Sequence, residues 1–473
     1  MSTLLEHPQA QALLDQTDVS PNDVRACARQ LTAFIQRYLP CFYRDEQRGH
    51  ADTILRGKLT GLQRKTTEPI ATQAGQKRRP LQHFVGAGQW DDPTVRTELR
   101  RHVREELGDP QAVLILDNHG VPKQGQDSCG VSRQWCGRLG KVDNCQVGYF
   151  LAYAAPRGRT LIDARLYLPR ERADDGCHRR KTYVPEDVVF QEGWRIGLEL
   201  LRSSGRELPH GWVAGDDEFG RSSALRAQLR QEGERYVLDA PSNTLVRDLT
   251  TRRPPTRVDG RDRLPLFERA EVWAARQPKG RWRTIRLRGG EKGPRVVRAL
   301  QQRLQTKDED GCAGPRERLV VIRSCEKKPQ TWYTLSNAGK ETPLAEVVRA
   351  HGERPAVEQL FEEGNQEVGL NHYEVRGWTG WQHHMTLTLL ALWFLQVERL
   401  RLGKKTPPVT GSQVRQIFTE LLRRPRPSAT EIAARVSATL RRNEESRIYH
   451  WHRETGKFPP PRSYAGPPPR ADP

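Results

Sequence analysis

Five apolar residues at 112–116, "AVLIL", run directly into Asp117, and the chain then turns polar and acquires a glycine, a proline and a lysine by position 123. An apolar run of this length, bounded by turn residues, is typical of a fully buried strand. The sequence therefore predicts a buried strand that carries an acid at its tip. A fold for this chain must account for a carboxylate at that place.

The segments after Asp117 predict the rest of a mixed sheet. Strand-like runs at 145–155 and 160–169 are separated by the short turn "PRGR", which favours an antiparallel pair. A helix is predicted over 190–205, and a short apolar strand at 211–215 runs into Asp216. Acids after the first and the fourth strand of such a series indicate a mixed α/β fold with a ribonuclease H-like core.

Changes in pattern along the chain predict five regions. Helical spacing of apolar residues, with start signals at Asp91, Asp92 and Pro93, indicates an α-helical N-terminal domain. The segment 241–345 is rich in Arg, Gly and Pro yet holds alternating apolar residues, which favours a β-rich insertion. The predicted regions are 1–107, a helical DNA-binding domain; 108–240, the first part of the core; 241–345, the β-rich insertion; 346–402, the C-terminal helices of the core; and 403–473, a basic, partly disordered tail with one helix at 428–442.

The charge of the chain points to a polyanionic partner. Lys and Arg number 78 against 58 Asp and Glu, and this formal net charge of +20 favours nucleic acid. An ordinary solvated helical face is the alternative to a DNA-docking surface for the most basic part of the helical domain. That segment, 55–84, carries Arg56, Lys58, Arg64, Lys65, Lys77, Arg78 and Arg79.

Several features favour a cytoplasmic protein without a membrane partner. The longest apolar run, 387–395, is too short to cross a bilayer and is predicted to be a buried helix. The N-terminus lacks the pattern of a secretion signal. The eight cysteines include no Cys-x-x-Cys pair and are expected to be reduced packing residues.

Asp117 and Asp216 are predicted to converge, because the first and the fourth strand are neighbours in the expected sheet. Two carboxylates brought close together repel each other unless a cation lies between them. Hard oxygen ligands suit Mg²⁺ or Mn²⁺. Glu358 offers a third ligand, and Arg354, one turn earlier, a group that holds phosphate or orients a carboxylate. Acids that only cap helices or bind loops remain the alternative.

Four longer strings, at 130–154, 161–175, 212–220 and 357–395, resemble the seven-hundred-and-one family of DDE-type insertion-sequence transposases; they include "WVAGDDEFG" and "NHYEVRGWTGWQHH". The resemblance implies a ribonuclease H-like core with a β-rich insertion before the last acid. Carried over by position, it makes Asp117, Asp216 and Glu358 the catalytic acids and metal ligands. Arg354 falls on the arginine of the family's signature.

This sequence departs from the family's signature at two places. His351 stands where the signature has a tyrosine. Asn365 stands where it has a lysine, which removes a positive charge that contacts DNA phosphate in related enzymes. The second change puts the efficiency of this copy in question more than its mechanism.

Two of the three acids have a competitor nearby. Asp217 directly follows Asp216 and is the alternative second ligand. Glu374 is the alternative to Glu358, although no arginine precedes it by one turn. The histidines at 372, 383 and 384 lack an acid at ligand spacing and are expected to pack or to contact phosphate.

The resemblance implies a transposase that binds double-stranded DNA, both the terminal inverted repeats of an insertion sequence and target DNA, in the bacterial nucleoid. Because two ends must be joined, a homodimer on DNA is expected. Two Mg²⁺ ions, or Mn²⁺ in their place, would serve both strand cleavage and strand transfer. Trp282, flanked by arginines, is the first choice for stacking on an unpaired base, with packing inside the insertion as the alternative. The competing functions are a domesticated, catalytically silent DNA-binding protein and a metal-dependent nuclease without strand transfer.

Overall fold

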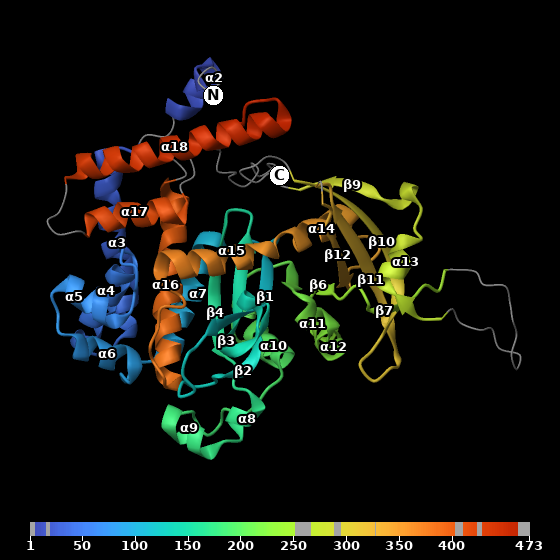
Figure 1. Cartoon of the computed structure of the whole chain (residues 1–473), viewed down its shortest axis with the longest axis horizontal. Coiled ribbons are helices and arrows are strands. Elements are labelled where there is room, and N and C mark those ends of the chain that lie inside the picture. Colours follow the sequence, from blue (N-terminus) through green and yellow to red (C-terminus); the bar gives the residue numbers. More distant parts are fainter. Residues whose placement is uncertain are drawn as a thin grey trace, which may run out of the picture.

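Six helices form the first part of the chain in the computed structural model, which describes residues 5–15, 19–250, 266–287, 295–326, 328–402, 410–422 and 428–461 (Figure 1). Their apolar residues recur at helical spacing; in α3, Ser20 and Asp23 form a capping box ahead of one buried stripe. The predicted start of the last helix is confirmed, since Asp91 accepts a hydrogen bond from the Thr94 N–H at 3.2 Å. The helices are α2 (Pro8–Leu14), α3 (Pro21–Tyr38), α4 (Asp45–Lys58), α5 (Thr67–Ala74), α6 (Arg78–Gly86) and α7 (Asp92–Leu107).

A mixed sheet follows, in the strand order of a ribonuclease H-like core. β3 lies antiparallel between β4 and β1, whereas β1, β5 and β6 are parallel to one another. The order β4–β3–β1–β5–β6 confirms the predicted fold class and the predicted pairing of the strands before the two acids. A short strand that the sequence pattern did not indicate, β2, pairs with the start of β3. The strands are β1 (Val113–Pro122), β2 (Ser132–Cys136), β3 (Lys141–Ala155), β4 (Gly158–Leu166), β5 (Trp212–Gly215) and β6 (Tyr236–Ala240), and the helices among them α8 (Arg170–Ala173), α9 (Gly176–Thr182), α10 (Gly193–Ser203), α11 (Asp217–Arg221) and α12 (Ser223–Gln231).

The insertion continues the same sheet. Its last strand pairs antiparallel with β6, and the other strands extend the sheet outward from there. Buried side chains around Trp273 give it a small core of its own. The predicted strands within 281–288, 318–325 and 331–339 are present as β9, β11 and β12; 251–265 and 288–294 lie outside the described residues. The elements are β7 (Leu245–Arg247), β8 (Glu268–Arg269), α13 (Ala270–Ala275), β9 (Arg283–Arg286), β10 (Val296–Lys307), β11 (Ala313–Ser324) and β12 (Thr331–Ser336).

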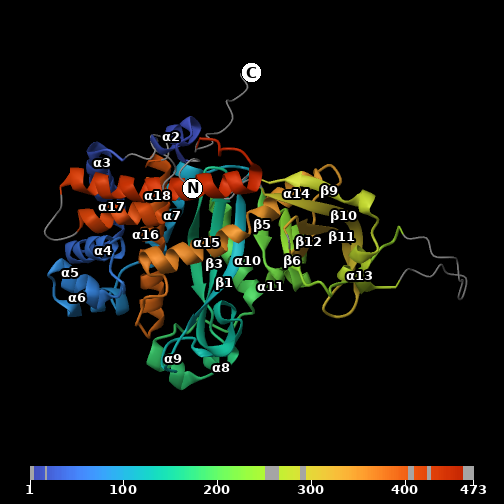
Figure 2. The ribbon, with the colours of Figure 1, turned by 45° about the horizontal axis from the view of Figure 1, so that its top comes forward.

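The helical region and the insertion lie at opposite ends of the molecule, with the core sheet between them, in both ribbon views (Figure 2). Helices α14 (Leu344–Gly352), α15 (Pro355–Glu363) and α16 (Trp378–Leu402) return the chain to the core. α16 is buried over almost its whole length and packs on β4 and on several N-terminal helices, which confirms the predicted buried helix.

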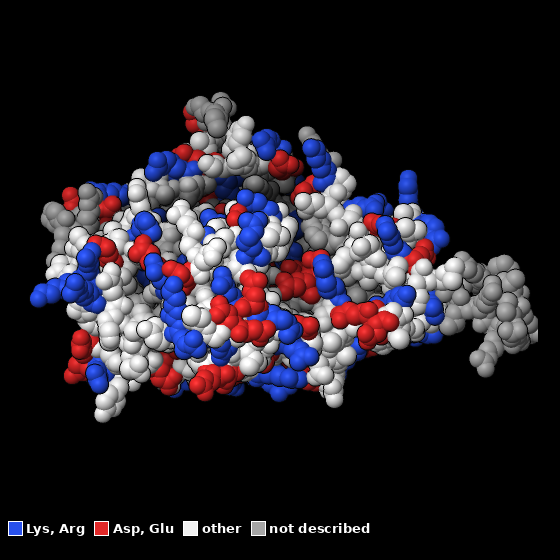
Figure 3. Space-filling view, turned by 60° about the horizontal axis from the view of Figure 1, so that its bottom comes forward, with Lys and Arg blue, Asp and Glu red and all other residues white. Residues whose placement is uncertain are grey.

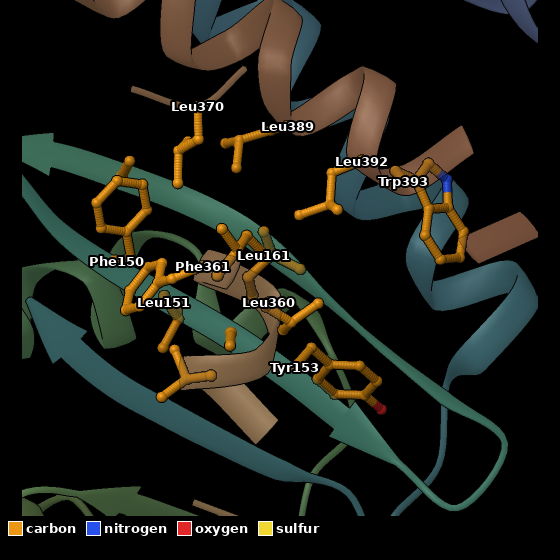
Figure 4. Packing of buried hydrophobic residues seen from close by; sticks show 14 of the residues in the cluster. Phe150, Leu151, Tyr153, Leu161, Leu360, Phe361, Leu370, Leu389, Leu392 and Trp393 are labelled. Atoms are coloured by element: carbon orange, nitrogen blue, oxygen red, sulfur yellow. The ribbon is translucent and has the colours of Figure 1, made fainter. Parts of the chain in front are cut away.

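Apolar side chains fix α15 against the sheet (Figure 4). Leu360 and Phe361 point toward β3, and the rings of Phe150 and Phe361 meet edge to face at 5.1 Å. One continuous hydrophobic cluster joins the N-terminal helices, the core sheet and α16. Helices α3 to α7 therefore share the core of the sheet, whereas α2 packs in a separate small cluster with Ile448.

The region after 402 is more ordered than the prediction of a tail with one helix. Two helices, α17 (Gly411–Leu421) and α18 (Ala429–Thr455), pack on each other and on α3. Both begin with a capping box, at Thr410 and at Ser428. The apolar residues Val414, Ile417 and Phe418 of α17 are buried at helical spacing, a signal that the high local charge obscured. Residues 462–473 of the proline-rich end lie outside the described residues.

Candidate active site

A cavity of about 1230 Å³ opens where β1, β5 and β6 end as a parallel set, beside α11 and α15. Figure 3 shows acidic and basic side chains intermingled over one face of the molecule, so no single basic patch dominates that face. The lining of the cavity is different, because carboxylates outnumber cations in it. The charged lining residues are Asp117, Asp216, Asp217, Glu218, Asp239, Glu358 and Glu362, with Arg138, Arg221 and Arg354.

Asp117 is held in the middle of a strand. The parallel pairing of β1 with β5 ends at Leu116 and Gly215, so Asp117 and Asp216 are the next residues on adjacent strands. β1 itself continues to Pro122 against β3, which corrects the expectation that the strand ends at the acid. β1 continues as a strand because β3 pairs with it beyond the last residue of β5.

Asp216 is positioned by the turn from β5 into α11. Its carboxylate caps this short helix and accepts a hydrogen bond from the Glu218 N–H at 3.1 Å. α11 lies so close to β6 that a Cβ atom at Gly220 would fall 1.7 Å from the Asp239 carbonyl oxygen. The glycine therefore brings the turn that carries Asp216 against the strand that carries Asp239.

The two aspartates share an environment that disfavours their charge. Burial and the neighbouring Asp216 carboxylate raise the pKa of Asp117 well above its usual range, and Arg354 opposes that rise. Burial and the Glu218 carboxylate raise the pKa of Asp216 to about 6, again against Arg354. A cation in the cavity would relieve this repulsion.

Glu218 fixes the position of the turn that carries Asp216. Its carboxylate accepts hydrogen bonds from the Tyr149 hydroxyl and from Asn118 Nδ2, the latter at 2.6 Å. These bonds tie the α11 turn to β3 and β1. Asp217, the alternative second ligand, also lines the cavity, but it is half exposed and pairs with Arg221 at 2.6 Å.

Glu358 faces the same cavity from α15. Its side chain is 62% exposed, and Arg354 Nη1 donates to Glu358 Oε1 at 3.2 Å. The competing acid, Glu374, pairs with Arg64 at 2.8 Å and does not line this cavity. The structure thus brings Glu358, and not Glu374, into one cavity with Asp117 and Asp216.

A fourth acid, Asp239 on β6, was not singled out from the sequence. It is buried, and its two oxygens contact Arg354 Nε at 2.8 Å and His351 Nε2 at 3.0 Å. Burial alone would lower the pKa of Arg354, but Asp239 and the other carboxylates raise it overall. Asp239 therefore anchors Arg354 at the edge of the acidic group.

Of the residues predicted to bind DNA, Arg354 lines the cavity and the others lie elsewhere. Trp282 packs partly buried against the core of the insertion, with the Arg323 guanidinium 4.8 Å from its ring, and does not line the cavity. Trp332 and Trp135 do line it. Lys77, Arg78 and Arg79 are exposed at the start of α6, where Arg78 pairs with Glu68 at 2.8 Å.

The histidines are packing groups, as expected. His383 stacks on Trp90 at 3.8 Å, and His384 hydrogen-bonds the Leu370 carbonyl oxygen at 3.1 Å. Asn365 lines the cavity at the expected place of a lysine, with its Nδ2 3.3 Å from His119 Nε2 and its Oδ1 buried without a hydrogen bond.

The acids suit a divalent cation in kind. Their oxygen atoms are the hard donors that Mg²⁺ and Mn²⁺ prefer. Within the described ranges, no three His, Cys, Asp or Glu side chains are close enough to hold an ion as they stand. Glu358 is turned toward Arg354 in this conformation, and a three-carboxylate site requires that it release the guanidinium.

A family model for "DDE superfamily endonuclease" matches residues 37–294, more than half of the 473-residue chain. The chain therefore belongs to the DDE endonuclease superfamily, as its resemblance to DDE-type transposases predicted. The matched region includes Asp117 and Asp216 and ends before Glu358. Enzymes of this superfamily generally use divalent metal ions.

Within that superfamily, the chain is 34% identical over 169 residues to a probable transposase for insertion sequence element IS701 from Microchaete diplosiphon. The alignment covers 34% of this chain and 44% of the relative, so it spans less than half of the relative's length. The piggyBac transposase in a synaptic complex with hairpin DNA is similar over 86% of this chain and 76% of that chain, with 12% identity and a TM-score of 0.39. Because this TM-score is low, the fold assignment rests on the strand order.

None of the helices in the described part of the chain combines the length and the apolar character that spanning a membrane requires.

Proposed function

We propose that this chain is a metal-dependent DNA transposase that cleaves and joins strands at the terminal inverted repeats of an insertion sequence. One observation carries the proposal: Asp117 and Asp216, on adjacent parallel strands, share a cavity with Glu358 and carry more negative charge than Arg354 balances. Similarity to a probable IS701 transposase supports the same activity.

Asp117, Asp216 and Glu358 would hold the metal, which we propose to be two Mg²⁺ ions with Mn²⁺ as a substitute. When bound, such ions activate a water or a DNA 3′-hydroxyl and stabilise the leaving oxygen of a phosphodiester. Before that, Arg354 bridges Glu358 and Asp239 and partly neutralises the acids. If Glu358 held a metal, Arg354 Nη1 would lose this partner and would be available to a DNA phosphate, while Arg354 Nε stays on Asp239.

We propose double-stranded DNA, both element ends and target, as the partner. The net charge of +20 supplies the attraction. Lys77, Arg78 and Arg79, exposed at the start of α6, are the proposed phosphate contacts in the helical region. A homodimer on DNA follows from the need to join two ends, and the bacterial nucleoid is the expected place of action.

Two other functions make different predictions. A catalytically silent DNA-binding protein would bind the element ends without cutting them, a possibility that Asn365 in place of a lysine raises. A plain nuclease would cut without joining strands. The three acids facing one cavity favour a catalyst over the silent protein.

The test uses labelled duplex DNA from the borders of this gene, with Mg²⁺ and with chelator. Wild type should nick the element edge and join it to target DNA only with the metal, while Asp117→Asn and Glu358→Gln should lose cleavage by about a thousandfold or more. We call the cavity that holds Asp117, Asp216 and Glu358 the acidic cavity. Glu374 lies outside it, so the matched control variant Glu374→Gln should still cleave. Binding without cleavage in Mg²⁺ and Mn²⁺ would refute the catalytic proposal, and cleavage without joining would leave a nuclease.

Stacking of an unpaired base needs its own comparison. We propose Trp282 as one platform from its flanking arginines, but Trp332, which belongs to the same insertion, lines the cavity and Trp282 does not. If stacking occurs beside the acids, Trp332→Ala should slow end processing more than Trp282→Ala does. The reverse order, in proteins with equal Tm, would assign the platform to the insertion surface.

A further inference from the structure

A second, smaller cavity of about 220 Å³ lies between the N-terminal helices and the segment that leads into α16. It brings together parts of the chain more than 300 residues apart. The proposed catalytic chemistry uses none of its side chains. Its lining residues are Ile54, Lys58, Lys65, Thr66, Thr67, Ile70, Gln82, Val85, His372, Tyr373, Glu374, Val375, His384 and Leu387.

Two buried lysines dominate the polar part of this basic cavity. Lys58 is 1% exposed and Lys65 3% exposed. Lys58 Nζ donates to Thr388 Oγ1 at 2.7 Å and to the Val368 carbonyl oxygen at 3.4 Å, and Lys65 Nζ donates to the Thr60 carbonyl oxygen. Across the described ranges no carboxylate forms an ion pair with either ammonium group, so both charges lack a counterion.

Like charges among the lysines and histidines of the cavity lower the pKa values of these groups. Burial and the nearby Lys65 lower the pKa of Lys58 to about 7. Burial and Arg415 lower the pKa of Lys65 to about 7, against Glu367. Burial and Lys58 lower the pKa of His372 and of His384. An anion would reverse these shifts.

The start of α5 faces the same space. Thr66 and Thr67 line the cavity, and the side chain of the N-cap residue Thr66 makes no capping hydrogen bond to the helix. The first backbone N–H groups of a helix carry partial positive charge and bind anions well. Glu68, the acid of the first turn, pairs with Arg78.

One carboxylate lies at the rim of the basic cavity. Glu374 is 61% exposed and pairs with Arg64 at 2.8 Å. Lys123 adds a further cation, since its ammonium lies over the Tyr373 ring at 3.6 Å from the centroid. The charge around the cavity therefore stays positive when either lysine is protonated.

We propose that this basic cavity binds a phosphate group, held by the ammonium groups of Lys58 and Lys65 and by the N–H groups of Thr67 and Glu68 at the start of α5, where the next residue, Pro69, has none. The phosphate belongs either to the backbone of bound DNA or to a free phosphate ion. The DNA source rests on the proposed function, whereas the site itself does not.

The first experiment titrates the full chain with inorganic phosphate in chelator, at constant ionic strength set with chloride, by calorimetry and by the shift in Tm. Wild type should bind one phosphate saturably. Lys65→Met, which keeps the apolar stem, should lose at least about tenfold in affinity. Lys340→Met, at an exposed lysine outside the cavity, is the matched control and should bind as wild type does.

Two further measurements protect this test from a variant that does not fold. Lys58→Met should lose phosphate affinity as Lys65→Met does. In wild type, phosphate should also protect Lys65 from a small amine-modifying reagent, as read by mass spectrometry. Absence of saturable binding in wild type, or unchanged affinity in both methionine variants, would overturn the proposal.

Duplex DNA then identifies the source. If the phosphate is part of DNA, saturating duplex should abolish the phosphate titration, and Lys65→Met should weaken duplex binding. If duplex-bound protein still binds inorganic phosphate, the site takes the free ion. Neither measurement uses strand cleavage, so failure of the phosphate site and failure of the transposase proposal are distinguishable.

Discussion

The two cavities of this protein hold opposite charge in excess. In the acidic cavity, Asp117 and Asp216 crowd each other and Arg354 offsets them in part. In the basic cavity, Lys58 and Lys65 are buried without a carboxylate ion-pair partner among the described residues. Each cavity destabilises its own charges when it holds no ligand, one by lack of cations and the other by lack of anions.

Other buried charges in the molecule are balanced by the protein itself. Arg96 contacts Asp163 at 2.9 Å, and Arg226 contacts Glu317 at 3.0 Å, with all four side chains almost fully buried. Such pairs hold elements together and need no ligand. A buried charge therefore indicates a binding site when no opposite charge of the protein balances it.

The largest effect is expected when one acid is neutralised. The pKa of Asp216 rises from 3.8 to about 6 on folding, so the folded chain binds this proton more tightly than the unfolded chain does. The resulting stability is fully present below pH 4 and is lost as the pH rises through 6. In chelator at pH 7.5, Asp216→Asn should therefore stabilise the chain by up to about 3 kcal/mol in urea unfolding, and Mg²⁺ should no longer raise its Tm. Asp187→Asn, at an exposed aspartate, is the control. If Asp216→Asn is less stable than wild type, the charge of Asp216 does not destabilise the folded chain.

The basic cavity should show the opposite dependence on pH. The pKa of Lys58 falls from 10.5 to about 7 on folding, so the unfolded chain binds more protons between these values and stability rises with pH. From pH 7 to 9 in chloride buffer, wild type should gain about 2 kcal/mol more than Lys58→Met. Parallel pH profiles would contradict the assignment. Lys65, His372, His384 and Glu374 line the cavity with Lys58, and Arg415 and Glu367 act on Lys65.

The smallest effect should come from Asp239, which links the acids to their counterion. Asp239→Asn keeps a hydrogen-bond acceptor for His351 but frees Arg354 to pair with Glu358 and the other acids. The Mg²⁺ concentration for half of the Tm shift should rise about tenfold, equal to about 1.4 kcal/mol. An unchanged Mg²⁺ requirement would show that Arg354 does not compete with the metal.

The sequence predicted the acidic cavity better than the basic one, for a physical reason. Asp117 and Asp216 each follow an apolar run, and parallel pairing of such runs brings the next residues together. Asp239 carries the same signal in "RYVLDAP", because it also follows an apolar run. A search for every acid in or after a buried run would have found it.

Lys58 and Lys65 show where local patterns fail. Both were predicted to belong to an exposed DNA-docking segment, and the structure buries both. Their burial depends on His372 and on α16, more than 300 residues later, and no local periodicity reports such contacts. Likewise, β2 depends on its pairing with β3, which the pattern of its own few residues does not indicate.

The central place of α16 has a consequence for how the chain is made. Helices α3, α4, α6 and α7 pack on α16, which comes much later in the sequence and ends at Leu402. At about 5–20 residues per second, a ribosome needs roughly 15–60 s to reach it after finishing α7. A nascent chain that stops before α16 keeps the apolar faces of its early helices uncovered, so its N-terminal helices complete their packing only after the helix that carries Glu358, α15, has already been made.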